Sequence, residues 1–286
     1  MSLDPRLNAV RDDLADVALR GQVDAPHFAE GRAARVVVGL TPVLRAAQPD
    51  AAVETFFHYG EAVRVFDACD GYAWCQSRRD SYVGYVDDSA LTDGEGPAPT
   101  HYVAALGAYR YAEADLRSPV VDFLPRHAPV AVAQAGFACR GTAYVWLEGG
   151  GFLPEACLSA APPRSPDLAA AASLYLGCPY LWGGRSFLGL DCSGLVQEAF
   201  RDLGQTVPRD TDMQRARIGA PVVALRPADL YRNDLIYIPD HVLIYAGKGA
   251  AIHASGRDMT VRQDNLAVLM RHWGYGFADL AVRRAR

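Results

Sequence analysis

The chain has 286 residues, of which 50% are hydrophobic and 21% charged, so it is long enough to build more than one hydrophobic core. Its formal net charge is −5 at pH 7, and no basic run is present, which argues against nucleic acid or an anionic membrane surface as a partner. No stretch approaches the run of about 18 apolar residues that a membrane-spanning helix needs.

The first eight residues contain Asp4 and Pro5, where a secretory signal peptide would carry a positive cluster and an apolar core. Six scattered cysteines need no disulfide framework in a chain of this size. We therefore expect a cytoplasmic protein, in which a reducing environment keeps a catalytic thiol usable. Five cysteines have no cysteine or histidine at metal-ligand spacing and are expected to be structural: Cys69, Cys75, Cys139, Cys157 and Cys178.

A first block of short alternating strands runs from about residue 36 to 92, with strands predicted over 62–66, 72–76 and 82–86 between glycine and aspartate turns. Short strands at this spacing favour a small β-barrel. Gly60-Glu61, a strand containing Trp74 and the later Gly84-Tyr85-Val86 resemble bacterial SH3-like domains.

A second block, from about residue 101 to 160, repeats this order with strands predicted over 129–133, 142–146 and 151–154. We therefore predict two SH3-like barrels, preceded by an N-terminal extension that packs on them. The predicted ranges are 1–35 for the extension, 36–95 for the first barrel and 96–161 for the second.

A proline-rich joint over 162–166 separates these β-rich blocks from a segment of mixed composition. Helices are predicted over 167–176, which opens with an aspartate, and over 193–203, while strands follow from residue 234 onward. Helices followed by an antiparallel, hairpin-rich sheet indicate an α+β domain, for which we predict the range 162–286.

Within this domain, a glycine-punctuated loop leads into Cys192 at the start of an apolar stretch. The backbone N–H groups of a helix's first turn are unpaired, and the helix dipole is positive there. A thiol at that position should lose its proton more easily than a free cysteine. Cys192 is therefore predicted to be a nucleophilic thiolate.

Two histidines follow on predicted strands, His241 within 240–246 and His253 within 249–255. The turn Gly247-Lys248-Gly249 can reverse the chain tightly. The hairpin then brings the two histidines to within one or two residues of cross-strand register. An imidazole that takes the thiol proton and a second polar group that fixes its tautomer form a generalised catalytic triad.

Several motifs in the same order resemble the NlpC family of papain-like cell-wall cysteine peptidases. They are Tyr180-Leu181-Trp182-Gly183-Gly184, Asp191-Cys192-Ser193-Gly194, Pro208-Arg209-Asp210-Thr211 with Gln214, Asp234-Leu235-Ile236-Tyr237 before His241, and the hydrophobic-His-Ala pattern around His253. The resemblance implies a papain-like peptidase domain with Cys192 as nucleophile, His241 as base and His253 as the orienting residue.

The resemblance also implies substrate contacts close to the nucleophile. Tyr180 would line the site and is a candidate oxyanion donor, while Asp191 and Ser193 would contact the D-glutamate part of the substrate. Thr211 stands where the family commonly has serine, and Trp182 is a further expected substrate contact. No metal or cofactor is implied.

Two segments of the first barrel block resemble a subgroup of murein-peptide recycling enzymes: Glu54-Thr55 with Tyr59-Gly60-Glu61, and Asp80-Ser81-Tyr82-Val83-Gly84-Tyr85. That subgroup cleaves between γ-D-glutamate and a diamino acid in short peptides with a free N-terminal L-alanine. The resemblance places Glu54, Tyr82 and Asp210 around the substrate's terminal ammonium, which needs acceptors to replace its lost hydration.

The sequence thus predicts a cysteine endopeptidase acting on free murein tri- or tetrapeptides in peptidoglycan recycling. Two alternatives stay open, namely an exported hydrolase of intact peptidoglycan and a catalytically silent wall-peptide binding protein. The complete set of Cys192, His241 and His253 argues against the silent protein. The sequence does not distinguish meso-diaminopimelate from lysine after the cut, or the oligomeric state.

Overall fold

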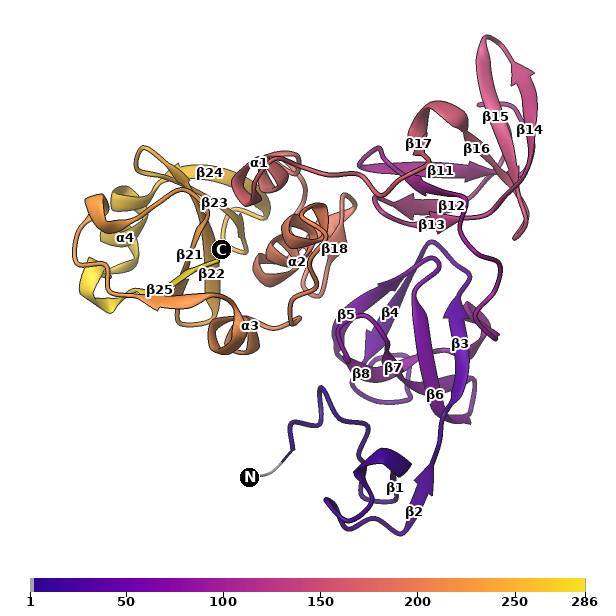
Figure 1. The fold of residues 1–286 in the computed structure, drawn as a ribbon, viewed down its shortest axis with the longest axis horizontal. Coiled ribbons are helices and arrows are strands. Elements are labelled where there is room, and N and C mark those ends of the chain that lie inside the picture. Colours follow the sequence, from indigo (N-terminus) through magenta and orange to yellow (C-terminus); the bar gives the residue numbers. More distant parts are fainter. Residues whose placement is uncertain (1–2, 286) are drawn as a thin grey trace. The chain divides into compact units, whose positions relative to one another are not determined.

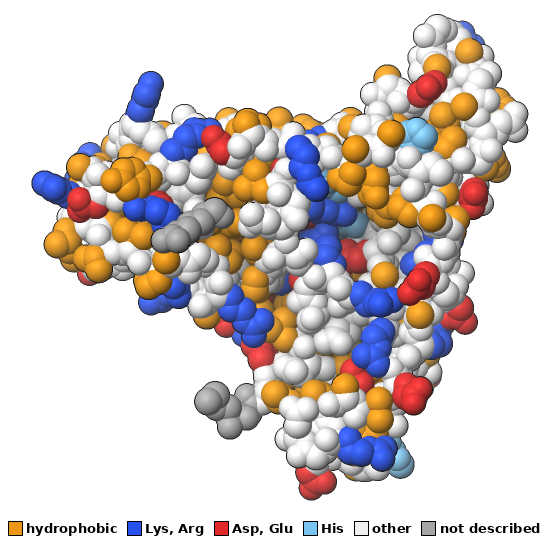
Figure 2. Space-filling view, viewed as in Figure 1, with side chains coloured by type: hydrophobic (Ala, Val, Ile, Leu, Met, Phe, Trp, Pro, Cys, Tyr) orange, Lys and Arg blue, Asp and Glu red, His pale blue; other side chains and the backbone are white. Residues whose placement is uncertain are grey.

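The structure is a computed structural model that describes residues 3–285. Two compact units make up the chain, Met1–Pro163 and Arg164–Arg286. In the described part, no helix has both the length and the apolar character needed to cross a membrane. Figure 2 shows acidic and basic side chains interspersed over the visible face of each unit, in keeping with 28 basic and 33 acidic residues in the sequence.

The N-terminal segment packs on the first large sheet of its unit. It contains β1 (Leu14–Asp16), a 3-10 turn η1 (Val17–Leu19) and β2 (His27–Ala29), and β1 pairs with β2 in parallel. Ala9 is buried with Phe66 and Trp74 of the sheet. Arg11 lies over the Trp74 ring and donates to Asp67 at 2.8 Å.

The first large sheet has seven strands in the order β5-β4-β8-β7-β6-β3-β9. Their bounds are β3 (Arg32–Val36), β4 (Leu40–Leu44), β5 (Val53–His58), β6 (Ala62–Cys69), β7 (Tyr72–Ser77), β8 (Val83–Asp87) and β9 (Leu91–Asp93), with η2 (Asp88–Ala90) before β9. Its core contains Val36, Val43, Phe57 and Val63. Residues Arg32–Arg35, which precede the predicted start of the first barrel at residue 36, pair with β6 as part of this sheet.

The second group of strands forms a three-stranded sheet, β13-β10-β17, and a five-stranded sheet, β12-β11-β16-β15-β14. Their bounds are β10 (His101–Val103), β11 (Gly107–Tyr111), β12 (Val120–Pro125), β13 (Pro129–Val130), β14 (Val132–Cys139), β15 (Thr142–Leu147), β16 (Phe152–Pro154) and β17 (Leu158–Ser159), with η3 (Glu155–Cys157) between the last two. Val103, Leu124, Leu147 and Leu153 form their common core.

The C-terminal unit has four helices, a small hairpin and a six-stranded sheet in the order β20-β25-β21-β22-β23-β24. The helices are α1 (Leu168–Ser173), α2 (Cys192–Asp202), α3 (Thr211–Arg217) and α4 (Leu266–Trp273). The strands and turns are β18 (Arg185–Ser186), β19 (Gly189–Leu190), β20 (Ala220–Val222), η4 (Pro227–Asp229), β21 (Asp234–Ile238), β22 (His241–Gly247), β23 (Ala250–Ser255), β24 (Thr260–Asn265), η5 (Phe277–Asp279) and β25 (Ala281–Arg284).

The six-stranded sheet is covered on both faces, with α1 and α2 on one side and α4 on the other (Figure 1). Residues of β21 are buried throughout, as expected for a strand covered on both faces. Leu266 and Met270 of α4 pack with Ile236, Leu243 and Tyr245. The sheet therefore fixes β22 and β23 rigidly between two layers of helices.

The helix boundaries show how local signals fix individual ends. Asp167 caps α1, its carboxylate accepting the Ala170 N–H at 2.7 Å, but α1 ends at Ser173 rather than at the predicted residue 176. Helix α2 begins at Cys192 itself, one residue before the predicted start. Helix α4, which the sequence analysis missed, begins after Asn265 as a side-chain cap and ends at Gly274, whose φ is 78°.

Candidate active site

The loop that presents Cys192 is fixed by the carboxylate of Asp191. This carboxylate accepts the N–H groups of Gly194 at 2.7 Å and Gly183 at 2.8 Å, and it forms a 2.5 Å ion pair with Arg209. Asp191 is the N-cap of α2, a position where a side-chain acceptor satisfies one of the unpaired helix N–H groups. Cys192 therefore stands in the first turn of a firmly anchored helix.

Gly194 allows this helix to approach the loop closely. A Cβ at Gly194 would lie 2.1 Å from the carbonyl oxygen of Gly184, a separation that no side chain can accept. Gly194 is therefore needed for packing, because it lets α2 lie against the backbone of the preceding loop.

The two histidines meet across the hairpin as predicted. Ile244 of β22 pairs with Ile252 of β23, which places His253 opposite Leu243 and two residues diagonally from His241. His241 Nε2 lies 2.9 Å from His253 Nδ1. Their rings are near perpendicular, at 79° with centroids 5.1 Å apart.

Trp273 of α4 closes the far side of this histidine pair. Its ring centroid lies 5.6 Å from each imidazole, at interplanar angles of 85° and 81°. His253 is fully buried, so the hydrogen bond between the two histidines is shielded from water. Trp273 was not predicted from the sequence, because this residue lies on helix α4, which was not predicted either.

Asp264 of β24 extends the chain of hydrogen bonds by one residue. Its Oδ2 lies 3.2 Å from His253 Nε2, and its Oδ1 accepts Arg262 Nη2 at 2.7 Å. Burial raises the pKa of Asp264, but hydrogen bonds from Arg262 and His253 outweigh it and hold that pKa below its usual range. Asp264 is therefore an ionised carboxylate at neutral pH.

An ionised carboxylate only accepts hydrogen bonds, and this fixes both tautomers. His253 must donate Nε2–H to Asp264, so its Nδ1 accepts from Nε2–H of His241. The remaining nitrogen of His241, Nδ1, then carries a lone pair. That is the state a general base needs.

The thiol of Cys192 lies beside this base. Its Sγ is 3.8 Å from Thr211 Oγ1 and is hydrogen-bonded by the backbone N–H of Val242, the residue that follows His241. The 8% exposure of Cys192 leaves a narrow opening for a substrate carbonyl. Helix α2 and strand β22 thus bring together residues that are 49 positions apart in the sequence.

The expected lowering of the Cys192 pKa is contradicted. Burial, with the negative charge of Asp191, raises the pKa of the Cys192 thiol to about 11, despite the Val242 N–H and Thr211. Burial and the neighbouring His253 lower the pKa of His241 to about 3. Burial therefore favours the neutral forms of the thiol and the imidazole, because desolvation outweighs the effect of the helix N-terminus.

Three further residues that the sequence predicts near the nucleophile differ in their burial and in their hydrogen bonds. The pKa of Tyr180 is raised to about 12, chiefly by burial. Ser193 Oγ accepts Arg209 Nη1 at 2.7 Å. Trp182 is 66% exposed, so the structure does not bring it into the buried cluster around Cys192.

Arg209 is only 1% exposed, and it forms an ion pair with Asp191 and a hydrogen bond with Ser193. It stands in one of the motifs quoted from the sequence, where no role was predicted for it. A substrate contact by Asp191 would have to replace one of these internal bonds. Asp210 and Thr211 follow Arg209 directly and form the N-cap and first residue of α3.

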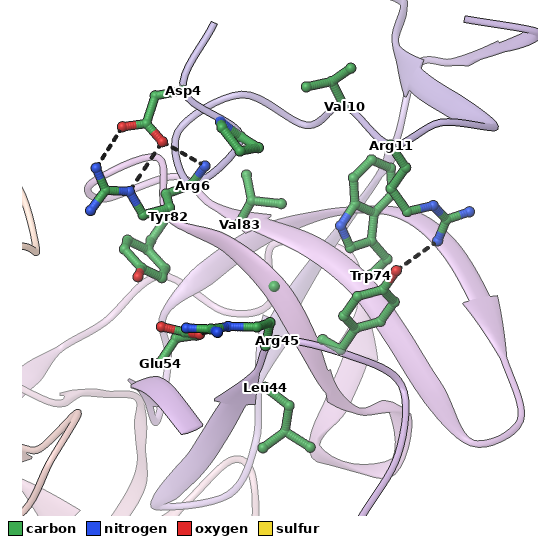
Figure 3. Close-up of a pocket in the computed structure, with 13 residues that line it drawn as sticks. Asp4, Arg6, Val10, Arg11, Leu44, Arg45, Glu54, Trp74, Tyr82 and Val83 are labelled. Atoms are coloured by element: carbon green, nitrogen blue, oxygen red, sulfur yellow. Dashed lines mark hydrogen bonds and ion pairs between the residues drawn. The ribbon is translucent and has the colours of Figure 1, made fainter. Parts of the chain in front are cut away.

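Glu54 and Tyr82 belong to the other unit, where they line a cavity of about 490 Å³ between the N-terminal segment and the first sheet (Figure 3). Glu54 lies on β5 and forms an ion pair with Arg45, the residue after β4. Asp4, Arg6 and other residues of the N-terminal segment close the cavity's opposite side.

Over the described residues 3–285, no group of three or more His, Cys, Asp or Glu side chains is arranged to hold a metal ion. The site instead holds a thiol beside two imidazoles and a carboxylate that are hydrogen-bonded to one another in sequence. Such an arrangement can transfer an acyl group to the thiol and then to water.

Two segments of the chain match known protein families. Residues 177–274 match the NlpC/P60 family, and residues 43–91 match the bacterial dipeptidyl-peptidase Sh3 domain. The chain contains an NlpC/P60 domain. Cys192, His241, His253 and Asp264 all lie within this domain, and Glu54 and Tyr82 lie within the Sh3 match.

Curated relatives match the chain over part of its length. It is 35% identical over 107 residues to a γ-D-glutamyl-L-lysine dipeptidyl-peptidase of Bacillus cereus, covering 35% of this chain and 31% of the relative. It is 37% identical over 91 residues to dipeptidyl-peptidase 6 of Lysinibacillus sphaericus, covering 31% of this chain and 32% of that relative. The matched segments thus span about a third of these relatives.

The fold of the NlpC/P60 domain together with its N-terminal strands recurs in a solved structure. An NlpC/P60 family protein from Bacillus cereus superposes with a TM-score of 0.69 at 20% identity, covering 88% of this chain and 99% of that protein. The fold class expected from the sequence, a papain-like α+β domain after SH3-like strands, is confirmed.

Proposed function

We propose that this chain is a cysteine peptidase that hydrolyses the bond between γ-D-glutamate and a diamino acid in free murein peptides. The observation that carries the proposal is the run of hydrogen bonds from His241 through His253 to Asp264 beside Cys192, whose Sγ is hydrogen-bonded by the N–H of Val242, the residue after His241. The names of the curated relatives, which include γ-D-glutamyl-L-lysine dipeptidyl-peptidases from two Bacillus species, support the choice of substrate bond.

The neutral thiol and imidazole define the first chemical step. As Cys192 Sγ attacks the γ-carbonyl of D-glutamate, its proton passes to Nδ1 of His241. Asp264 stabilises the imidazolium through His253, because a carboxylate at the end of the chain favours positive charge on the rings. The backbone N–H of Cys192 and the hydroxyl of Tyr180 receive the oxyanion in this proposal.

The second half of the reaction uses the same base. His241 Nδ1–H protonates the departing amine, the C–N bond breaks, and a thioester to Cys192 remains. Water then attacks the thioester while His241 takes its proton, which releases the acid and restores the thiol. Every proton moves through Nδ1, because Nε2 of His241 stays hydrogen-bonded to His253.

Recognition of a free N-terminus is assigned to Glu54, Tyr82 and Asp210. An ammonium removed from water needs acceptors, and carboxylates are the strongest available. An acylated nitrogen would leave them unpaired, which would confine cleavage to peptides already released from the sugar strands. Such a preference fits peptidoglycan recycling in the cytoplasm, which we propose as the setting.

The test is turnover of L-Ala-γ-D-Glu-diaminopimelate beside its N-acetylated twin, followed by mass spectrometry, with Cys192→Ala as the inactive control. We expect cleavage of the free peptide to L-Ala-D-Glu and little cleavage of the acetylated one. Equal cleavage of both would remove the ammonium site and favour an exported wall hydrolase, which activity on intact sacculi would establish. Cleavage of neither would refute the proposed substrate.

A further inference from the structure

A second cavity, of about 350 Å³, lies against the histidine pair of the C-terminal unit. Its walls include both histidines, Ile238, Trp273, Tyr275 and Arg257. Cys192 is not among its lining residues. The cavity therefore opens on the side of the general base rather than on the side of the nucleophile.

This placement identifies what the cavity holds in the proposed reaction. The departing amine must lie within hydrogen-bond reach of His241, which protonates it, so the leaving amino acid occupies the histidine side of the scissile bond. Tyr180, one of the residues predicted near the nucleophile, lies beside one wall of this cavity. A Cβ at Gly256, one of its lining residues, would lie 3.3 Å from the ring of Tyr180.

The side chains that line the cavity carry a positive charge and no negative charge at neutral pH. None of the lining residues is Asp or Glu, and burial holds the pKa values of both histidines below their usual range. Arg257 is therefore the one formal charge among the lining residues at neutral pH. It is exposed, and within residues 3–285 no hydrogen bond or ion pair links it to a carboxylate.

Two other carboxylates of this unit, those of Asp258 and Asp240, are not among the residues that line the cavity. Asp258 accepts the Ser255 hydroxyl at 2.7 Å and lies 3.3 Å from Arg262. Asp240 is exposed before the start of β22 and does not line the cavity. A ligand end that carries only positive charge would therefore meet an arginine with no carboxylate among the lining residues to balance it.

We propose that this cavity binds the departing amino acid and that Arg257 selects a side chain whose end carries a carboxylate beside its ammonium, as in diaminopimelate, over one that ends in an ammonium alone, as in lysine. The inference rests on the proposed function and extends it to the residue after the cut. The methylenes of the leaving side chain lie along Trp273 and Tyr275. Its terminal carboxylate accepts from the guanidinium, whose fork of N–H donors matches a carboxylate geometrically.

The experiment compares kcat/KM for L-Ala-γ-D-Glu-meso-diaminopimelate and L-Ala-γ-D-Glu-L-Lys. We expect the unaltered protein to prefer the first peptide by about tenfold or more, as one charge-assisted contact permits. Arg257→Gln should lower turnover of that peptide about tenfold and leave the lysine peptide within about twofold. Arg257→Glu should reverse the preference. Arg217→Gln, an exposed arginine of α3, is the matched control and should change neither value.

Each contrary outcome has a distinct meaning. Equal cleavage of both peptides by every variant overturns the inference and leaves the proposed function standing. A preference for lysine that Asp240→Asn abolishes also overturns it. Equal losses on both tripeptides in Arg257→Gln, with the D-Ala-extended tetrapeptide spared, would show that Arg257 binds the α-carboxylate and does not select. If the unaltered protein cleaves neither peptide, the proposed function fails and the inference fails with it.

Discussion

The charged side chains of the two candidate sites are held in opposite ways. In the C-terminal unit, the ion pair of Arg209 and Asp191 leaves only 1% and 8% of the two side chains exposed. In the N-terminal unit, Arg45 is 74% exposed and its partner Glu54 20%. A buried pair cannot exchange partners without a large desolvation cost, whereas an exposed pair exchanges them readily.

This difference suggests a division of labour. Buried, fully partnered groups keep the nucleophile and base in fixed geometry, which acyl transfer requires. The exposed pair can give up one partner, so that Glu54 can accept a substrate ammonium in place of Arg45. Variants in the C-terminal cluster should therefore change kcat, and variants in the N-terminal cavity should change discrimination between substrates.

The largest expected effect is at the nucleophile. Cys192→Ala should lower kcat by about 10⁴-fold or more, because no other group can form the acyl intermediate. Cys178→Ala is the control, since Cys178 is buried away from the histidines with its Sγ 2.8 Å from the Phe187 carbonyl, and it should keep kcat. Steady-state turnover measures kcat for both variants. Comparable losses of kcat in the two variants would show that Cys192 is not the nucleophile.

The next effect tests the tautomer assignment. Asp264→Asn should lower kcat about a hundredfold, because an amide N–H can donate to His253 Nε2 and so reverse the direction of the hydrogen bonds. Nitrogen-15 NMR of the histidines should show the exchanged tautomer. Asp258→Asn, which also loses an Arg262 contact but has no hydrogen bond to His253, should leave the spectrum and kcat unchanged. If the two variants behave alike, Asp264 has only a structural role.

A smaller effect is expected in the N-terminal cavity. Glu54→Gln should lower kcat/KM about tenfold for the peptide with a free amine, through loss of one charge-assisted contact. It should barely change the slow turnover of the acetylated peptide. Glu95→Gln, which removes an exposed partner of Arg78 in the same unit, serves as the control. A uniform loss on both peptides would break the proposed division of labour.

The smallest effect concerns stability against acid. An unfolded chain protonates its histidines near pH 6.5, whereas burial lowers the folded pKa of His241 to about 3. The unfolded state therefore binds more protons below pH 6.5, and the free energy of unfolding should fall as pH falls towards 3. One such histidine contributes about 1.4 kcal/mol per pH unit within that window. Urea titrations at pH 7 and pH 5 measure the loss, which should be smaller in His241→Asn.

Most of the site could be predicted from the sequence because its signals are local. The hairpin around Gly247-Lys248-Gly249, the cap at Asp191 and the start of α2 depend on residues within a few positions of each other. The pairing of His241 with His253 then follows from the length of one turn. Cys192, His241 and His253 could be named for this reason.

The groups that complete the site depend on distant packing. Asp264 reaches His253 only because β24 pairs with β23 in the register that sets Arg262 opposite His253, and Trp273 reaches it through α4. The pKa of Cys192 rises because several elements bury the thiol together, which the helix N-terminus alone could not indicate. The sequence by itself determined which residues react, because motifs and turns act locally. The tertiary structure decided their protonation, their hydrogen-bond direction and the Arg257 cavity, because burial and strand register arise only when remote segments pack.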